Sequence, residues 1–498
     1  MATVKVADGM ATTNASDLKQ PVPDQVAEGE LESLVDDGND PKLVRRIDLW
    51  LCPMLALSMA LQFIDKGALP AASILGIVTD LHLTGTEYSW ANSIFYFGYF
   101  AFTYLVPYLF VKYPIGKVLS ATFLAWALTV GVHAACKNAA GLMIVRFFLG
   151  FTEAAVAPGC SLILGMWYKR EEHALRHGYW YMGTSLGIAL TGLISFGIAH
   201  IKKGLGAWRW LFITLALISL VWAALMFWLL PDTPANARFL SKSQRARAVD
   251  RVRVNEMGVK TSNFKWYQFR EAMTDLKVWL LVFYLVAVCI CNSSITAFSQ
   301  IVLVGLGFDV YQTNLFNIAL GALTAVVAFS STLLCTRVTN IRGFVCVVLC
   351  CISLIGSILV RFGPNLGSKL VGFLLFYAYP CTVAIALSLI ASNVAGFTKK
   401  TVATAMSFVA YCSGNIIGPF LFFAREKPKY PSGFNATSIC FGAAIVLMLA
   451  YVFVVHRENR LRERAHTPGD VVLNDASQQE DAAKDLTDGE NPRFRYMA

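Results

Sequence analysis

The sequence predicts an all-α membrane protein with twelve transmembrane helices in two groups of six. The 498 residues are 56% hydrophobic and only 15% charged, which leaves too little polar surface for a soluble protein of this length. Apolar stretches of about 20 residues, the length that crosses a bilayer, recur along the chain. A polar, basic segment separates the sixth stretch from the seventh, and this divides the chain into two halves.

Each predicted span is an apolar run bounded by polar, glycine- or proline-containing segments. The twelve spans are expected at about 47–75, 88–110, 117–136, 139–167, 178–200, 208–230, 277–303, 312–334, 343–361, 369–391, 401–423 and 434–455. The predicted organisation is a tail over 1–44, a six-helix half over 45–230, a central loop over 231–276, a second six-helix half over 277–456 and a tail over 457–498. The first forty residues are acidic and polar, as is the stretch from about His466, so both are expected to be disordered.

The central loop is rich in Arg and Lys. Leu240, Ala246, Val249 and Val252 recur in it at near-helical spacing, which predicts an amphipathic helix on the inner membrane surface. The alternative is a solvated linker.

Basic residues near the helix ends predict the orientation. With a cytoplasmic N-terminus, roughly 26 of them fall on the inner side and roughly 10 on the outer side, so both termini are expected in the cytoplasm. The net charge of +10 is therefore explained by topology, and no basic soluble domain is left to bind nucleic acid.

A charged stripe runs through the fourth predicted span, RFFLGFTEAAVAPG. Arg146, Gly150, Glu153 and Ala157 fall on one helix face because seven residues make almost two turns. A charge at membrane depth costs about 3 kcal/mol or more, so it should face a cavity or a partner. One interpretation is an Arg–Glu pair that joins helices. The other is a substrate or proton site, with the small residues leaving a groove.

A second charged pair, Asp65 and Lys66, lies in the first span. Lys66 is about ten residues and Arg146 about seven residues from the outer ends of their spans, so the two cations lie at similar depth. Two cations facing one cavity would bind a carboxylate, Arg as a fork and Lys as a point charge. The alternative is that Asp65 only neutralises Lys66.

Several motifs together resemble the fungal allantoate permease family, in the anion:cation symporter branch of the major facilitator superfamily. The resemblance covers about 45–465. It rests on Asp65-Lys66, RFFLGFTEAAVAPG, MWYKREEHALRHG, WRWLF, LPDTPANARFLS, SNVAGFTKKTVATAM, GNIIGPFLF and REKPKYPSGF. It implies the major facilitator fold, with substrate bound between two six-helix halves. It also implies anion binding by Lys66 and Arg146 and proton coupling by Glu153. Asp65 is the second candidate for proton coupling, because it is the other acid placed within a cavity-lining span.

Three further residues are candidates for substrate contact. Asn292 shares a helix face with Thr296 and Ser299, and either cavity lining or helix–helix hydrogen bonding would explain this polar face. Tyr96 and Tyr377 are placed to contact substrate or to pack.

The leading functional hypothesis is proton-coupled uptake of a small organic anion, such as allantoate, ureidosuccinate or a nicotinate-like carboxylate. A metabolite or toxin efflux transporter and a nutrient-sensing receptor are the alternatives. The sequence holds no phosphate loop, metal-ligand cluster or nucleophile motif, so neither an enzyme nor a bound metal or cofactor is expected. The expected partners are the anion, protons and the lipid bilayer, and the expected form is a monomer in the plasma membrane.

Overall fold

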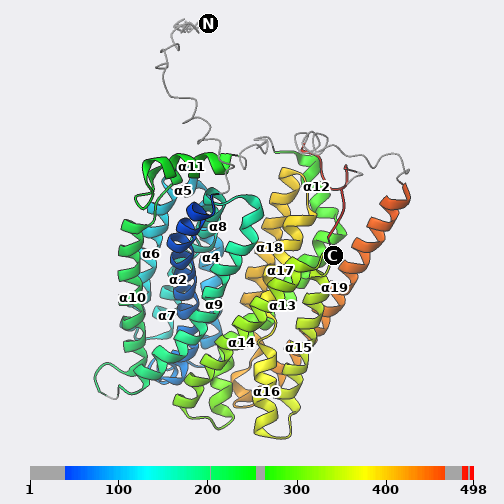
Figure 1. Cartoon of the computed structure of the whole chain (residues 1–498). Coiled ribbons are helices and arrows are strands. Elements are labelled where there is room, and N and C mark those ends of the chain that lie inside the picture. Colours follow the sequence, from blue (N-terminus) through cyan, green and yellow to red (C-terminus); the bar gives the residue numbers. More distant parts are fainter. Residues whose placement is uncertain (1–39, 202, 254–263, 466–484, 492–493, 498) are drawn as a thin grey trace, which may run out of the picture.

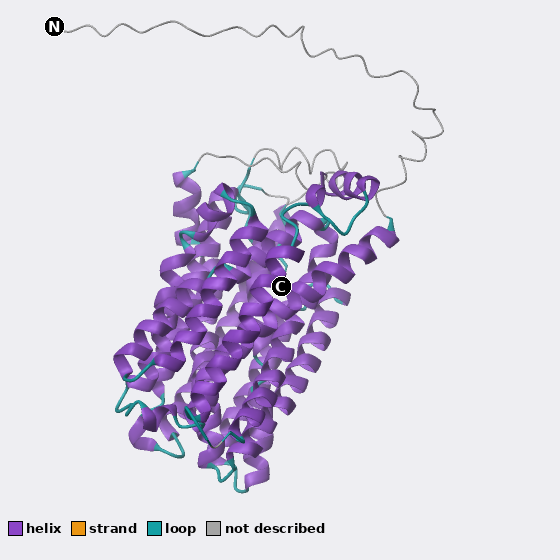
Figure 2. Cartoon of the chain, turned by 90° about the vertical axis from the view of Figure 1, so that its left-hand side faces the viewer, coloured by secondary structure: helices purple, strands orange, loops and turns teal. Residues whose placement is uncertain are grey.

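The computed structural model describes residues 40–201, 203–253, 264–465, 485–491 and 494–497. Throughout these residues the regular structure is helical and no strand is present (Figure 2). The predicted all-α class is therefore confirmed.

The long helices follow the predicted spans closely (Figure 1). The first group is α2 (Pro41–Ile74), α4 (Glu87–Thr103) with α5 (Val106–Lys112), α6 (Ile115–Val132), α7 (Ala139–Glu153) with α8 (Val156–Trp167), α9 (Arg170–Ala199) and α10 (Ala207–Leu229). The second group is α13 (Leu276–Gly305), α14 (Val310–Arg337), α15 (Arg342–Phe362), α16 (Leu366–Phe376) with α17 (Pro380–Asn393), α18 (Phe397–Ile417) and α19 (Pro431–Ala465).

The number of membrane spans lies close to the predicted twelve. Among the described residues, ten spans are long and apolar enough to cross a membrane, and the pair α4–α5, bent by 41°, makes eleven. The span expected at 401–423 corresponds to α18, which has 21 residues but is more polar because it begins FTKKT and turns Thr404 and Ser407 toward a cavity. The count of twelve therefore stays a prediction.

Besides the bent pair α4–α5, two more spans are interrupted partway along their length. One break falls between α7 and α8, directly after Glu153. The other falls between α16 and α17, where Pro380 opens the new helix because proline fits the first turn but not a helix interior. Broken spans expose backbone groups at mid-membrane and are common at transporter binding sites.

The predicted helix of the central loop is present as α11 (Lys242–Arg253), and a second helix, α12 (Trp266–Thr274), precedes α13. Both lie at the same end of the bundle (Figure 1). The buried face of α11 differs from the predicted stripe, because Ala248 and Arg251 are buried while Ala246 is exposed. Arg251 forms an ion pair with Glu172 of α9, so α11 packs on the protein through charge as well as apolar contact.

The end of the chain is more ordered than the sequence predicts. Asp488 is buried and its carboxylate lies 2.7 Å from Nζ of Lys399 in α18. Tyr496 donates to the same carboxylate at 2.9 Å. The expectation of disorder therefore does not hold for residues 485–491 and 494–497, while 466–484 lie outside the described residues.

The two groups of helices contact each other along three lines. Helix α9 packs against α14, α2 against α13, and α4 against α18. These contacts enclose the cavity described next.

Candidate functional site

A cavity of about 620 Å³ lies between the two groups of helices. Residues of α2, α4 and α7–α9 form one side, which we call the N-terminal wall. Residues of α13, α14, α17 and α18, with the turn between α16 and α17, form the other side, the C-terminal wall. Both walls contain residues that the sequence singled out.

The N-terminal wall contains a buried ion pair between two spans. Nζ of Lys66 in α2 lies 3.4 Å from Oε1 of Glu153 in α7. The same oxygen accepts a hydrogen bond from Nε2 of Gln62 at 2.9 Å. Gln62 and Lys66 are four residues apart, so they project from the same face of α2 toward one carboxylate. Glu153 is fully buried behind Lys66 and is not among the residues lining the cavity.

Arg146 lines the cavity and is 4% exposed. Its Nε donates to the carbonyl oxygen of Ala91 at 3.1 Å, and its guanidinium lies 5.7 Å from the centre of the Phe95 ring. Its Nη1 has no hydrogen-bond partner among the described residues. The guanidinium is therefore anchored at one edge by α4, and a second donor is free.

Asp65 is 2% exposed and is held by a residue that the sequence analysis did not single out. Its Oδ2 accepts a hydrogen bond from Nε1 of Trp126 in α6 at 3.2 Å, and its Oδ1 has no partner in the described part of the chain. Asp65 does not lie within ion-pair distance of Lys66. Lys66 pairs with Glu153 instead, because adjacent residues point to different sides of a helix.

The two charged residues of the α7 stripe contact different helices. Arg146 and Glu153 share a face, but Glu153 contacts α2 while Arg146 contacts α4. A same-helix Arg–Glu pair is therefore not formed. The structure brings Lys66 and Arg146 to one cavity, as their matched depth predicts.

The small residues of the stripe also differ in role. A Cβ atom added to Gly150 would lie 1.9 Å from the carbonyl oxygen of Phe95, so glycine is needed for the close approach of α7 and α4. The predicted groove beside Gly150 is therefore wrong. Ala157, one turn beyond Glu153, does line the cavity.

The C-terminal wall is polar but uncharged at its described lining residues. Asn292 donates to Oδ1 of Asn415 at 2.9 Å and accepts from Oη of Tyr379 at 2.8 Å. Thr296 and Ser299, on the same face as Asn292, also line the cavity. Both explanations of this polar face therefore apply, since Asn292 lines the cavity and hydrogen-bonds between helices.

Tyr96 and Tyr377 line the cavity from opposite walls. The Tyr96 ring packs edge-to-face on Tyr411 of α18, with centroids 6.0 Å apart. Tyr377 is 8% exposed and lies at the break between α16 and α17.

Four important residues were missed by sequence reasoning. Gln62 could have been found by its i, i+4 spacing from Lys66. Trp126, Tyr379 and Asn415 carried no such signal, because each reaches its partner across the bundle from a distant part of the chain.

Hydroxyl groups close the end of the cavity at which α4 begins. Tyr88 Oη donates to the carbonyl of Ala297 at 2.8 Å, Ser89 Oγ to that of Pro419 at 2.9 Å and Ser93 Oγ to that of Ile416 at 2.8 Å. These bonds join the first helix group to the second at the end away from α11 and α12 (Figure 1).

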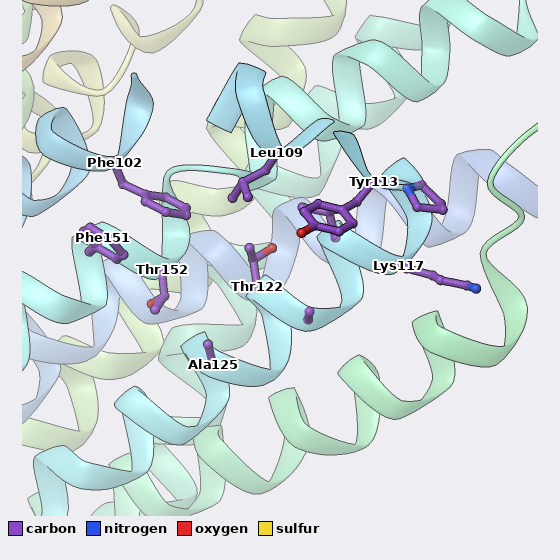
Figure 3. Close-up of a pocket in the computed structure, with 11 residues that line it drawn as sticks. Phe102, Leu109, Tyr113, Lys117, Thr122, Ala125, Phe151 and Thr152 are labelled. Carbon is purple, nitrogen blue, oxygen red and sulfur yellow. The ribbon is translucent and has the colours of Figure 1, made fainter. Parts of the chain in front are cut away.

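A second cavity, of about 450 Å³, lies beside α5, α6 and α7 and is lined mainly by apolar residues (Figure 3). Lys117 is the charged residue among those lining it, and Figure 3 shows its amine directed away from the other labelled side chains. This cavity does not bring an acid and a base together, so it is not the candidate site.

Comparisons with known proteins agree with this architecture. The family model described as Major Facilitator Superfamily matches residues 55–419. An uncharacterized transporter of Schizosaccharomyces pombe is 34% identical, over 91% of this chain and 87% of its own. The Allantoate permease of Saccharomyces cerevisiae is 31% identical, over 95% of this chain and 89% of its own. The Thiamine pathway transporter THI73 of the same yeast is 31% identical, over 92% and 86%.

Solved structures of low sequence identity share the fold. The proton:xylose symporter XylE superposes with a TM-score of 0.63 at 12% identity, covering 82% of this chain and 95% of that one. An inward-facing bacterial homologue of the lysosomal transporter Spinster gives a TM-score of 0.62 at 14% identity, covering 82% and 96%.

Proposed function

This chain belongs to the Major Facilitator Superfamily and is a multi-pass membrane transporter, and from that premise we propose that it takes up a small organic anion together with a proton. The observation that carries the proposal is the ion pair between Lys66 and Glu153 at the edge of a cavity that Arg146 also lines. The similarity to the Allantoate permease supports the anion:cation symporter branch.

Lys66 couples the two ions because it serves two partners in turn. In the empty site its ammonium group neutralises Glu153. A carboxylate entering the cavity would compete with Glu153 for the same cation. Protonation of Glu153 removes that competition and leaves Lys66 free to bind the substrate.

Arg146 supplies the second contact to the anion. Its Nε is already bound to the backbone of α4, and its free Nη1 can donate to a carboxylate oxygen. Gln62 keeps a hydrogen bond to Glu153 when Lys66 turns toward the substrate, so the carboxyl group keeps its position through the cycle. Asp65 also lines the cavity, is held there by Trp126, and offsets the remaining positive charge.

In the proposed cycle, the outward-facing site loads a proton and an anion together. On the cytoplasmic side Glu153 loses its proton, Lys66 returns to it, and the anion leaves a site whose charge has fallen by one. Asn292, Tyr96 and Tyr377 contact the uncharged part of the substrate. We further propose a monomer in the plasma membrane, with both termini cytoplasmic and residues 45–230 and 277–456 moving as the two halves.

The decisive experiment is uptake of radiolabelled allantoate, ureidosuccinate and nicotinate at two external pH values, in cells that lack their own permeases. Accumulation of one carboxylate that increases at acid pH is the expected result. Export of preloaded carboxylate without uptake would support the efflux alternative and overturn the proposal.

A further inference from the structure

Aromatic rings surround the two cavity cations. The Lys66 ammonium lies 5.0 Å from the centre of the Phe63 ring, and the Arg146 guanidinium 5.7 Å from that of Phe95. Each cation therefore rests on a ring face, as in cation–π contacts. A carboxylate bound to either cation would place its first carbon atoms among aromatic side chains.

Rings from the two walls also meet across the cavity. Tyr99 of α4 stacks on Phe408 of α18, with centroids 5.6 Å apart and planes 27° apart. Tyr96 meets Tyr411 edge-to-face, and Phe408 and Tyr411 are themselves nearly parallel, at 25°. All four residues line the cavity. Aromatic faces prefer offset-stacked or edge-to-face partners, so this cluster suits a flat ring better than a puckered one.

The charges near the cavity fit a single negative charge on the substrate. With all four side chains ionised, the two carboxylates of Asp65 and Glu153 balance the two cations Lys66 and Arg146. One proton on Glu153 leaves one positive charge, which one carboxylate balances. A dicarboxylate would leave an uncompensated negative charge at membrane depth, where charge is costly.

Some of the uncharged polar groups of the C-terminal wall are already bound to each other, and others are not. Asn292, Asn415 and Tyr379 are bound to one another. Ser293 Oγ, Gln300 Oε1 and Asn317 Nδ2 are buried without a partner in the described part of the chain, which leaves polar groups for the substituents of a ring.

We propose that the transported anion is a flat aromatic or heteroaromatic monocarboxylate that crosses with one proton. This inference rests on the proposed function and narrows its substrate class. The carboxylate binds Lys66 and Arg146, and the ring packs against the cluster of aromatic side chains that α4 and α18 form.

The first test measures thermal stabilisation of the purified full-length protein by three probes. Benzoate has a flat aromatic ring and one charge, cyclohexanecarboxylate has one charge on a saturated, puckered ring of similar size, and phthalate adds a second carboxylate. A bound ligand raises the melting temperature in proportion to the logarithm of its concentration over its Kd. We expect benzoate to bind about five-fold more tightly than cyclohexanecarboxylate, from the contribution of aromatic pairing, and phthalate to bind more weakly than both.

The second test uses Phe408→Leu, with the lipid-exposed Phe227→Leu as the matched control. Phe408→Leu should remove the preference for benzoate and leave cyclohexanecarboxylate binding within about two-fold, because only aromatic pairing is lost. The control should change neither. Equal binding of the flat and saturated acids by the wild-type protein, or an equal loss of both in Phe408→Leu, would overturn this inference. If none of the three carboxylates raises the melting temperature of the wild-type protein or of the Lys66→Ala variant, the proposed anion site itself is wrong.

Discussion

The two walls of the cavity differ in the chemistry they present. The N-terminal wall holds every charged residue among those lining the cavity, and its Lys66 is paired with Glu153 directly behind it. The C-terminal wall offers amides, hydroxyl groups and aromatic rings, several of which are bound to each other. In the proposed mechanism, charge and coupling therefore belong to one wall, and the fit to the uncharged part of the substrate belongs to the other.

The two walls can also be compared by how they are built. The ion pair of the N-terminal wall is held between α2 and α7, while α7 lies against α4 closely enough that Gly150 admits no side chain. The C-terminal wall is interrupted between α16 and α17, where Tyr377 and Tyr379 lie. Both walls therefore contain a broken span, and they differ in what lies at the break: Glu153 at the end of α7 in one wall, and two tyrosines between α16 and α17 in the other.

The largest expected effect comes from removing a cation of the N-terminal wall. Lys66→Ala or Arg146→Ala should reduce anion uptake by roughly 30-fold or more, because truncating one side of a buried charge pair costs about 2–5 kcal/mol. Arg146→Lys should also transport poorly, since the planar fork is lost. The readout is uptake normalised to protein at the cell surface, with the exposed Lys137→Ala as the control. Normal uptake by both alanine variants would contradict the anion site.

Glu153→Gln should separate binding from accumulation. The amide imitates the protonated acid and can still meet Gln62, so substrate should bind and exchange across the membrane. It should not be concentrated against a gradient, and uptake should no longer depend on external pH. Counterflow and net uptake measured side by side give the two readouts, with the exposed Glu463→Gln as the control.

If the Glu153→Gln variant accumulates substrate with the pH dependence of the wild type, Glu153 is not the residue that couples proton and anion. Asp65 would be the next residue to test, because it is the other buried carboxyl group beside the cavity.

A change in the C-terminal wall should have a smaller effect and leave coupling intact. Asn292→Ala removes a residue that pairs with Tyr379 and Asn415, and it should weaken substrate affinity by about 3- to 10-fold, the range of one or two hydrogen bonds. Tyr379→Phe should change affinity in the same direction by less, because it loses one of those bonds. The pH dependence of uptake should match the wild type. A loss of pH dependence in either variant would show that the C-terminal wall also takes part in proton coupling.

The smallest effect on transport is expected from tags that test the orientation of both walls. Tags at either terminus and near Arg245 should leave uptake unchanged, since all three lie outside the described membrane helices. All three tags should be protected in intact cells and accessible after permeabilisation. Accessibility of the Arg245 tag alone in intact cells would break the arrangement of two halves around a cytoplasmic loop.

The sequence by itself determined the helical class, the approximate limits of the spans and the presence of α11. These properties follow from apolar length and from the spacing of residues within one segment, which local physics governs. The sequence also predicted that Lys66 and Arg146 face one cavity, because the depth of a residue in the membrane can be counted from the end of its helix.

Tertiary structure alone decided which charges meet. Lys66 has Asp65 beside it in the chain, yet its partner is Glu153, because neighbouring side chains on a helix diverge and helix packing chooses the contact across the gap. The same reason explains why Asp65 is held by Trp126, why Gly150 serves packing instead of a groove, and why Asn292 is joined to Tyr379. Spacing along one helix shows on which face a residue lies. Its partner on a neighbouring helix depends on the rotation and distance of that helix, and these are set only when the whole bundle packs.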